Sequence, residues 1–231
     1  MKKLLMIGML TGILSHARSQ VYVQGGVNFA NITQTKSGGT QDNNLLTTFN
    51  AGILGRLNLS TTLDLESGLL LQGRGAKANT YLSSSRDDNY VKTKFNPLYL
   101  EVPLNLVLRI PLENATNIFF NAGPYAAVGI TGKSKTESRL LGITSNTSKD
   151  IKFSNDDPST SQQEDASYDR LKRFDLGLNL GGGLDLGKVL LKLNYGYGFT
   201  KINSTQSDNS ADDKNKYRTI SVSLGIPLNR S

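Results

Sequence analysis

The segment LYLEVPLNLVLR, residues 98–109, decides how the chain folds, because apolar and other side chains alternate along its whole length. Every even-numbered position is apolar, whereas the odd-numbered positions include Tyr99, Glu101 and Arg109. Successive side chains of a β-strand point to opposite faces. The segment therefore predicts a strand with one apolar and one polar face.

The same alternation recurs along the chain. Eight segments show it, at residues 21–29, 49–59, 63–74, 98–109, 117–130, 173–186, 189–199 and 219–226. Each is about ten residues long, which is the length of a transmembrane β-strand. Eight such strands, each with one apolar face, favour a closed antiparallel barrel.

The connections between these segments alternate between long and short. The short ones lie near residues 60–62, 111–116 and 187–188, and the long ones near 34–45, 76–92, 132–169 and 203–216. All long connections therefore open at one end, as in outer-membrane barrels. The predicted fold is all-β: an eight-stranded antiparallel up-and-down transmembrane β-barrel with short periplasmic turns and long external loops, forming one domain over residues 20–231.

The polar faces carry charges of both signs. Ten of these residues are predicted to form an ion-pair network inside the lumen: Arg56, Asp64, Glu66, Arg74, Glu101, Arg109, Arg173, Asp175, Asp185 and Lys192. Five are basic and five acidic, which suits a narrow lumen because unpaired buried charge is costly. A barrel of this size has room for side chains rather than for an open channel. The lumen is therefore predicted to be plugged.

The apolar faces are predicted to point outward, into lipid. They carry almost no charge, and their aromatic residues near the long-loop end resemble an interfacial girdle: Phe29, Phe49, Phe174, Tyr197 and Phe199. A soluble lipocalin-like barrel that carries an apolar ligand remains the alternative, and it would place the same faces inside. The absence of Trp and of a C-terminal helix pattern speaks against that alternative.

The N-terminus has the pattern of a secretory signal peptide. Lys2 and Lys3 precede an apolar run over residues 4–14, and the small-x-small sequence ARS at 17–19 precedes Gln20. Residues 1–19 are therefore predicted to be cleaved. Cleavage removes three basic residues, so the net charge falls from +7 to +4, and no nucleic-acid partner is expected.

The composition excludes most catalytic chemistry. The chain has no Cys, and its one His, His16, lies in the predicted signal peptide. A mature chain that has neither Cys nor His cannot form a His-based triad, a Cys nucleophile or a His/Cys zinc site. An enzyme built on this barrel would need Ser with Asp or Lys, and no convergent set is visible. No cofactor or metal is expected; the acidic clusters at 155–157 and 211–213 lack the full calcium-ligand spacing.

Several motifs resemble those of the PorT-like outer membrane β-barrel proteins of Bacteroidetes. They are YLEVP at 99–103, NAGPY at 121–125, FDLG at 174–177 with Gly181 and Gly183 following, and NYGYG at 194–198. The similarity extends over residues 20–228. It implies an outer-membrane location and a barrel architecture, and it implies no activity.

The predicted function follows from these features. The chain is expected to be an outer-membrane barrel with a plugged, ion-paired lumen and without catalysis. Its role is expected to be structural or to involve surface contact through the long loops. The expected partners are outer-membrane lipid, and other envelope proteins or surface ligands at the loops.

Overall fold

The computed structural model describes residues 19–33, 45–81, 89–112, 116–154, 170–202 and 216–228. The predicted signal peptide lies outside the described residues except for Ser19, where the first strand begins. The acidic clusters at 155–157 and 211–213 also lie outside the described residues. No helix in the described part of the chain is long and apolar enough to cross a membrane.

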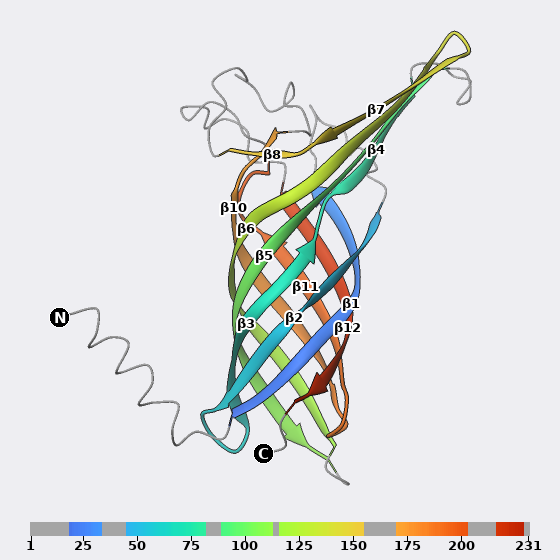
Figure 1. Ribbon diagram of the computed structural model, residues 1–231. Helices are drawn as coiled ribbons and strands as arrows, with labels where there is room; N and C mark the ends of the chain where they lie inside the picture. The colour runs from blue at the N-terminus through green and yellow to red at the C-terminus, as the bar shows by residue number, and fades with distance from the viewer. Residues whose placement is uncertain are drawn as a thin grey trace, which may run out of the picture.

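Eight antiparallel strands form a closed ring (Figure 1). They are β1 (Ser19–Thr33), β2 (Leu46–Asn58), β3 (Leu63–Gly73), β5 (Tyr90–Pro111), β6 (Asn117–Leu140), β10 (Phe174–Asp185), β11 (Leu190–Gly198) and β12 (Lys216–Pro227). Strand β1 pairs with β12, and the long strands β5 and β6 pair with each other, which closes the ring. The predicted eight-stranded barrel is confirmed.

The apolar faces point outward along the whole ring. Leu106 has 52% of its surface exposed, whereas its strand neighbour Asn105 has 2% exposed. The five predicted girdle residues are all exposed: Phe29, Phe49, Phe174, Tyr197 and Phe199. A lipocalin-like barrel would show the opposite arrangement, with these side chains buried. The polar side chains fill the inside instead.

The short turns all lie at one end of the barrel. They connect β2 to β3, β5 to β6, and β10 to β11, as predicted. The Ser60 hydroxyl accepts hydrogen bonds from the amides of Thr62 and Leu63 and so fixes the first of these turns. The start of β1 and the end of β12 lie at the same end of the barrel (Figure 1).

Two of the predicted long loops are wrong in part, because they contain strands. The barrel strand β3 continues into β4 (Ala76–Tyr81), which pairs with the first residues of β5. Strand β6 runs on to Leu140 and returns as β7 (Ile143–Asp150) through a tight turn at Leu141 and Gly142, both with positive φ. These segments are rich in Ser, Thr and Lys and lack an apolar face, so the hydrophobic alternation gave no signal for them.

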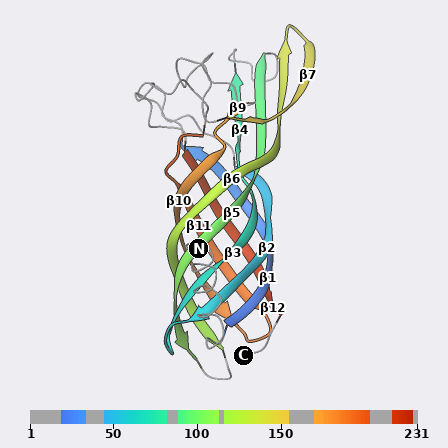
Figure 2. The ribbon, with the colours of Figure 1, turned by 60° about the vertical axis from the view of Figure 1, so that its left-hand side comes forward.

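The additional strands form a sheet that projects beyond the barrel (Figures 1 and 2). We define this projecting sheet as β4, residues 90–96 of β5, residues 133–140 of β6, and β7, paired in that order. Strands β5 and β6 have 22 and 24 residues. About 9–11 residues are enough to span a bilayer. The sheet therefore extends well past the membrane-spanning part, at the end opposite the short turns.

Candidate functional site

The lower half of the lumen, nearer the short turns, is organised around Glu66, whose side chain is fully buried. Arg56 Nε donates to Glu66 Oε2 at 2.9 Å, and Lys192 Nζ donates to Oε1 at 2.5 Å. The Tyr22 hydroxyl and the Asn105 amide donate to the same carboxylate at 2.6 and 3.1 Å. Four donors therefore replace the water that this carboxylate would bind in solution.

Strand register explains why Arg56 and Glu66 meet. The two residues are direct cross-strand partners on β2 and β3, at equal distances from the turn that joins the strands. The Arg56 guanidinium also stacks over the Phe119 ring, 4.3 Å from its centroid. Nearer the short-turn end, Arg109 Nε lies 2.7 Å from Asp64 Oδ2, and 22% of the Arg109 side chain is exposed. Asp185 accepts from the Gly187 amide of the β10–β11 turn.

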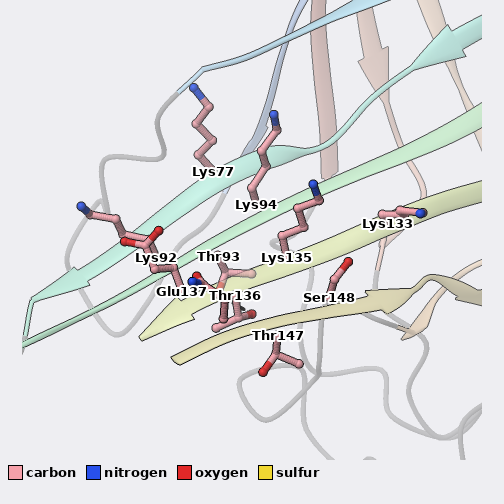
Figure 3. Close-up of a pocket in the computed structure, with 11 residues that line it drawn as sticks. Lys77, Lys92, Thr93, Lys94, Lys133, Lys135, Thr136, Glu137, Thr147 and Ser148 are labelled. Carbon is pink, nitrogen blue, oxygen red and sulfur yellow. Dashed lines mark hydrogen bonds between the residues drawn. The ribbon is translucent and has the colours of Figure 1, made fainter. Parts of the chain in front are cut away.

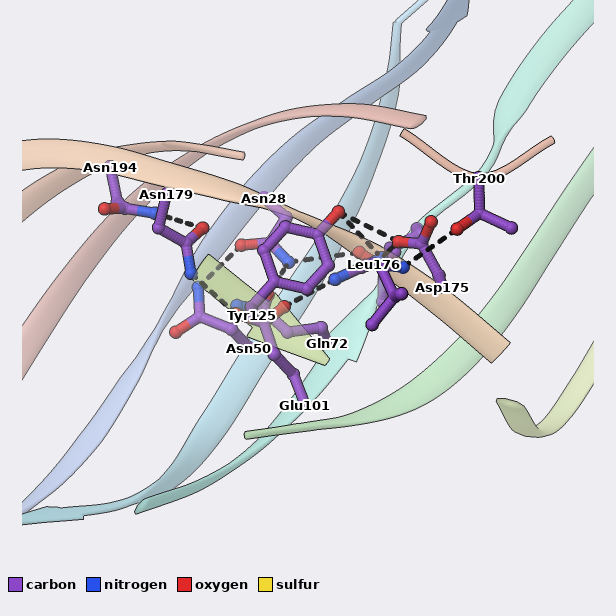
Figure 4. A network of polar contacts seen from close by, with 12 residues as sticks. Asn28, Asn50, Gln72, Glu101, Tyr125, Asp175, Leu176, Asn179, Asn194 and Thr200 are labelled. Carbon is purple, nitrogen blue, oxygen red and sulfur yellow. Dashed lines mark hydrogen bonds and ion pairs between the residues drawn. The ribbon is translucent and has the colours of Figure 1, made fainter. Parts of the chain in front are cut away.

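The upper half of the lumen, nearer the projecting sheet, is organised around Arg74, which directly follows β3. One guanidinium nitrogen lies 2.5 Å from Glu101 Oε2, and the other contacts Asp175 Oδ2. The Tyr125 hydroxyl donates to Asp175 Oδ2 at 2.8 Å, and the Tyr125 ring centroid lies 4.7 Å from the guanidinium carbon. Figure 4 shows Tyr125, Asp175 and Glu101 in this contact network.

A ladder of amide side chains lines the lumen and ends on Glu101 of the Arg74 cluster. Asn50 donates to Asn28 at 2.6 Å, and Asn28 donates to Gln72 at 2.7 Å. On the other wall, Asn194 donates to Asn179 at 3.1 Å, and Asn179 donates to Glu101 at 2.9 Å (Figure 4). The predicted site omitted these amides, although their inward parity on successive strands was a signal that could have identified them.

One predicted lumen residue lies elsewhere. Arg173 is exposed, and its guanidinium donates to the Phe153 carbonyl at 3.2 Å. The reason is that β10 begins only at Phe174, so the inward parity does not extend back to Arg173. The predicted balance of five against five is therefore corrected. The described lumen holds four basic residues against five acidic ones: Arg56, Arg74, Arg109 and Lys192 against Asp64, Glu66, Glu101, Asp175 and Asp185.

An apolar plug, which the sequence did not predict, closes the mouth below the projecting sheet. Its members come from several strands and connections: Ile32, Ala76, Phe95, Tyr99, Tyr125, Ala127, Ile151, Leu171, Ile202 and Tyr217. The short β8 (Lys152–Phe153) pairs with β9 (Arg170–Leu171) over this mouth, and the Phe153 ring packs edge-on against Tyr99 at 5.5 Å. Isolated Leu, Ile and Phe residues in connections gave no periodic signal.

The lumen is closely filled. A void of about 10 Å³ lies among Gln72, Arg74, Glu101 and Tyr125. A cavity needs roughly 10–15 Å³ to hold a single water molecule. A second apolar cluster, built around Tyr22, Leu54 and Phe119, adjoins the Glu66 cluster. Charged, amide and apolar side chains therefore occupy the described part of the lumen.

The projecting sheet carries basic side chains over a shallow pocket of about 690 Å³. Its lining includes five lysines: Lys77, Lys92, Lys94, Lys133 and Lys135. Figure 3 shows Lys77, Lys94 and Lys135 on one side of the sheet, and Thr93, Thr136 and Thr147 on the other. Within the described ranges, no three His, Cys, Asp or Glu residues gather as a metal site would require.

A match to one protein family agrees with this architecture. A family model described as an outer membrane protein beta-barrel domain matches residues 14–204. Three solved structures are similar. Ail, the attachment invasion locus protein of Yersinia pestis, in complex with the heparin analogue sucrose octasulfate, has 14% identity over 91% of this chain and 99% of that one, at a TM-score of 0.41. Neisserial surface protein A has 12% identity over 90% of this chain and 97% of that one, at a TM-score of 0.40. OprG from Pseudomonas aeruginosa has 11% identity over 92% of this chain and 94% of that one, at a TM-score of 0.33. None of the curated proteins compared with the chain matches it.

Proposed function

The chain belongs to the family of outer membrane protein beta-barrel domains, and from this premise we propose that it is a plugged barrel with a structural or surface-contact role. It resides in the bacterial outer membrane. The observation that carries the proposal is the pairing of a filled lumen with a sheet that projects beyond the bilayer. A filled lumen leaves the outer surface and the projecting sheet as the parts that can meet other molecules.

Two finer statements belong to this proposal. The first is that the chain is PorT-like, which is supported by the order of the YLEVP, NAGPY, FDLG and NYGYG motifs. The second is that it is not an enzyme. The ionised groups of the lumen are tied to one another, and the chain has neither Cys nor any His besides His16. Its partners would be outer-membrane lipid, and envelope proteins or surface ligands at the projecting sheet.

The orientation required by this role places the projecting sheet outside the cell. The termini of the barrel and its short turns lie at the opposite end, where an exported chain enters the membrane. Trypsin applied to intact cells should therefore cut at Lys133, Lys135 or Arg139 and leave the barrel core in the membrane. Cutting at these sites only after the outer membrane is permeabilised would contradict the orientation.

Folding into a membrane barrel is tested separately. A sample from the membrane fraction should migrate differently on an SDS gel before and after boiling, because a folded barrel resists the detergent until heated. A chain that is released into buffer without detergent, and whose migration does not change, would support a soluble barrel and contradict the proposal.

A further inference from the structure

The basic face of the projecting sheet continues the lipid-facing face of the barrel. On β5, Lys94 lies two strand positions from Asn96 and four from the outward-facing Leu98, so all three share one face. On β6, a register shift opposite Leu98 and Tyr99 keeps Lys133 and Lys135 on that same face, opposite Asn96 and Lys94. The lysines therefore begin directly above the apolar band that contacts lipid.

Three of these lysines form a row across neighbouring strands. Lys77 of β4 is the direct cross-strand partner of Lys94, and Lys94 is the direct partner of Lys135. Like charges placed directly opposite each other destabilise a sheet. A bound anion would remove that repulsion.

Two acidic side chains, Glu137 and Asp150, lie beside the lysines. The Tyr90 hydroxyl donates to Glu137 Oε1 at 2.7 Å, which raises the pKa of Tyr90, and the Lys92 ammonium stacks on the Tyr90 ring at 4.0 Å. Asp150 is the cross-strand partner of Lys133. Among the described residues, no salt bridge joins Lys77, Lys94, Lys133 or Lys135 to a carboxylate.

A second pocket joins these charges to apolar surface. Its volume is about 400 Å³, and Lys94, Lys133 and Lys135 line it together with Phe49 and Leu98. The first pocket, of about 690 Å³, shares the same three lysines. The two pockets thus form one surface that is cationic toward the tip of the sheet and apolar toward the membrane. A ligand that matches both parts has an anionic head and a hydrocarbon tail.

We propose that Lys77, Lys94, Lys133 and Lys135 bind the phosphate groups of an anionic lipid in the outer leaflet, with an acyl chain against Phe49 and Leu98. The inference rests on the proposed function, because it requires the projecting sheet to leave the membrane on the outer side. A soluble sulfated or phosphorylated polysaccharide could use the lysines, but it would have no use for the apolar pocket. The apolar lining is the reason to favour a lipid.

The test uses the mature chain, folded in neutral detergent micelles and verified by the heat-dependent gel shift. Lipid A is titrated, and the bound lipid is counted by native mass spectrometry. Dephosphorylated lipid A, inorganic phosphate and a heparin oligosaccharide serve as separate probes. We expect lipid A to bind, its dephosphorylated form to bind at least about tenfold more weakly, and added salt to weaken the binding.

Variants locate the site. Lys94→Gln with Lys135→Gln should weaken lipid A binding by about tenfold or more, since each lysine near an anionic headgroup contributes to the attraction. The matched control is Lys149→Gln with Lys188→Gln. Lys149 shares a face with the buried Ser134, and Lys188 lies in the turn at the far end of the barrel. This control removes the same charge and should bind like the original chain.

Each other result would overturn the proposal. Equal binding by the Lys94 and Lys135 double variant would remove these lysines from the site, and equal binding of dephosphorylated lipid A would exclude phosphate recognition. Lysine-dependent binding of heparin without binding of lipid A would replace the lipid by a soluble polyanion. A normal gel shift in these cases would leave the membrane-barrel proposal standing, so the two failures are distinguishable.

Discussion

At the scale of single residues, Glu66 is the side chain on which the lower lumen depends. Its carboxylate meets two cations, Arg56 at 2.9 Å and Lys192 at 2.5 Å, in a region closed to solvent. A buried charge that loses its partner costs far more than a surface ion pair contributes. The order in which substitutions destabilise the barrel should therefore follow the number of charges that each one leaves unpaired.

Glu66→Gln is expected to lower the free energy of unfolding by about 3–5 kcal/mol, because it leaves both Arg56 and Lys192 without a carboxylate at hydrogen-bond distance. Arg56→Gln should cost less, since Glu66 keeps Lys192. The double variant should cost clearly less than the sum of the single ones. Urea titration in micelles measures all three values, and strict additivity would contradict the pairing.

Arg109→Gln is the control for this cycle. Arg109 also pairs with a buried carboxylate, Asp64, at 2.7 Å, but its side chain is 22% exposed. The substitution leaves one buried charge, that of Asp64, without this ion pair, whereas Glu66→Gln takes the nearest carboxylate from two cations, so the loss should be smaller than that of Glu66→Gln. A loss as large as that of Glu66→Gln would mean that the number of charges left unpaired does not set the cost.

At the scale of elements, Gly75 is the joint between the barrel strand β3 and the projecting strand β4. Its φ is 119°, and a Cβ at this position would lie 2.1 Å from the Phe95 carbonyl oxygen. Gly75→Ala should therefore cost about 1–3 kcal/mol. The strain falls where β4 joins β5, so trypsin should cut faster at Lys77 while the heat-dependent gel shift persists.

Gly142→Ala provides the comparison for this prediction. Gly142, in the β6–β7 turn, also has a positive φ, 80°, but a Cβ added there would meet no atom within 4 Å. The substitution should show the backbone strain without the clash, and so a smaller effect on cutting at Lys77. Equal effects of the two substitutions would mean that the clash with the Phe95 carbonyl oxygen adds nothing to the backbone strain.

Alternation predicted those elements that have one apolar face and missed those that do not. The pairing of Arg56 with Glu66 follows from the short turn between β2 and β3, since pairing across a short turn fixes which residues face each other. The projecting strands were missed because Thr136, Ser138 and Lys135 alternate between two polar faces. Arg173 was misplaced because a parity argument holds only within a strand, and β10 starts one residue later.

At the scale of the whole molecule, the chain combines three features, an ion-paired lumen, an apolar plug and a basic face, of which the sequence predicts only part. The ion-paired lumen depends on strand parity, which is visible in sequence. The apolar plug depends on side chains such as Leu171 and Ile202, which come from connections and meet only in three dimensions. The basic face depends on pairings of segments without an apolar face, β4 with β5 and β6 with β7.

If the chain is exported to the outer membrane as proposed, its N-terminal segment should be a signal peptide that is cleaved off. Residues 1–19 should be absent from the protein purified from the outer membrane, because the apolar run over 4–14 and the ARS sequence at 17–19 form a signal-peptide pattern. Intact-mass measurement should give a chain that begins at Gln20. A mass that retains His16 would contradict the predicted processing.

The filled lumen makes a prediction about transport. Passage of ions would require displacing the Arg74 cluster, the amide ladder and the apolar plug together. Asn179 of the ladder bonds to Glu101, and the Arg74 guanidinium lies over the rings of the plug residues Tyr99 and Tyr217, so the three groups hold one another. Purified protein in a planar bilayer should therefore show no large, stable conductance, whereas a porin recorded under the same conditions shows the sensitivity of the measurement. Glu101→Gln alone should not open a channel, because the plug around Tyr99 and Tyr217 remains above it. Reproducible porin-sized steps from the original chain would mean that the plug moves as a unit, and the structural or surface-contact role would then give way to transport.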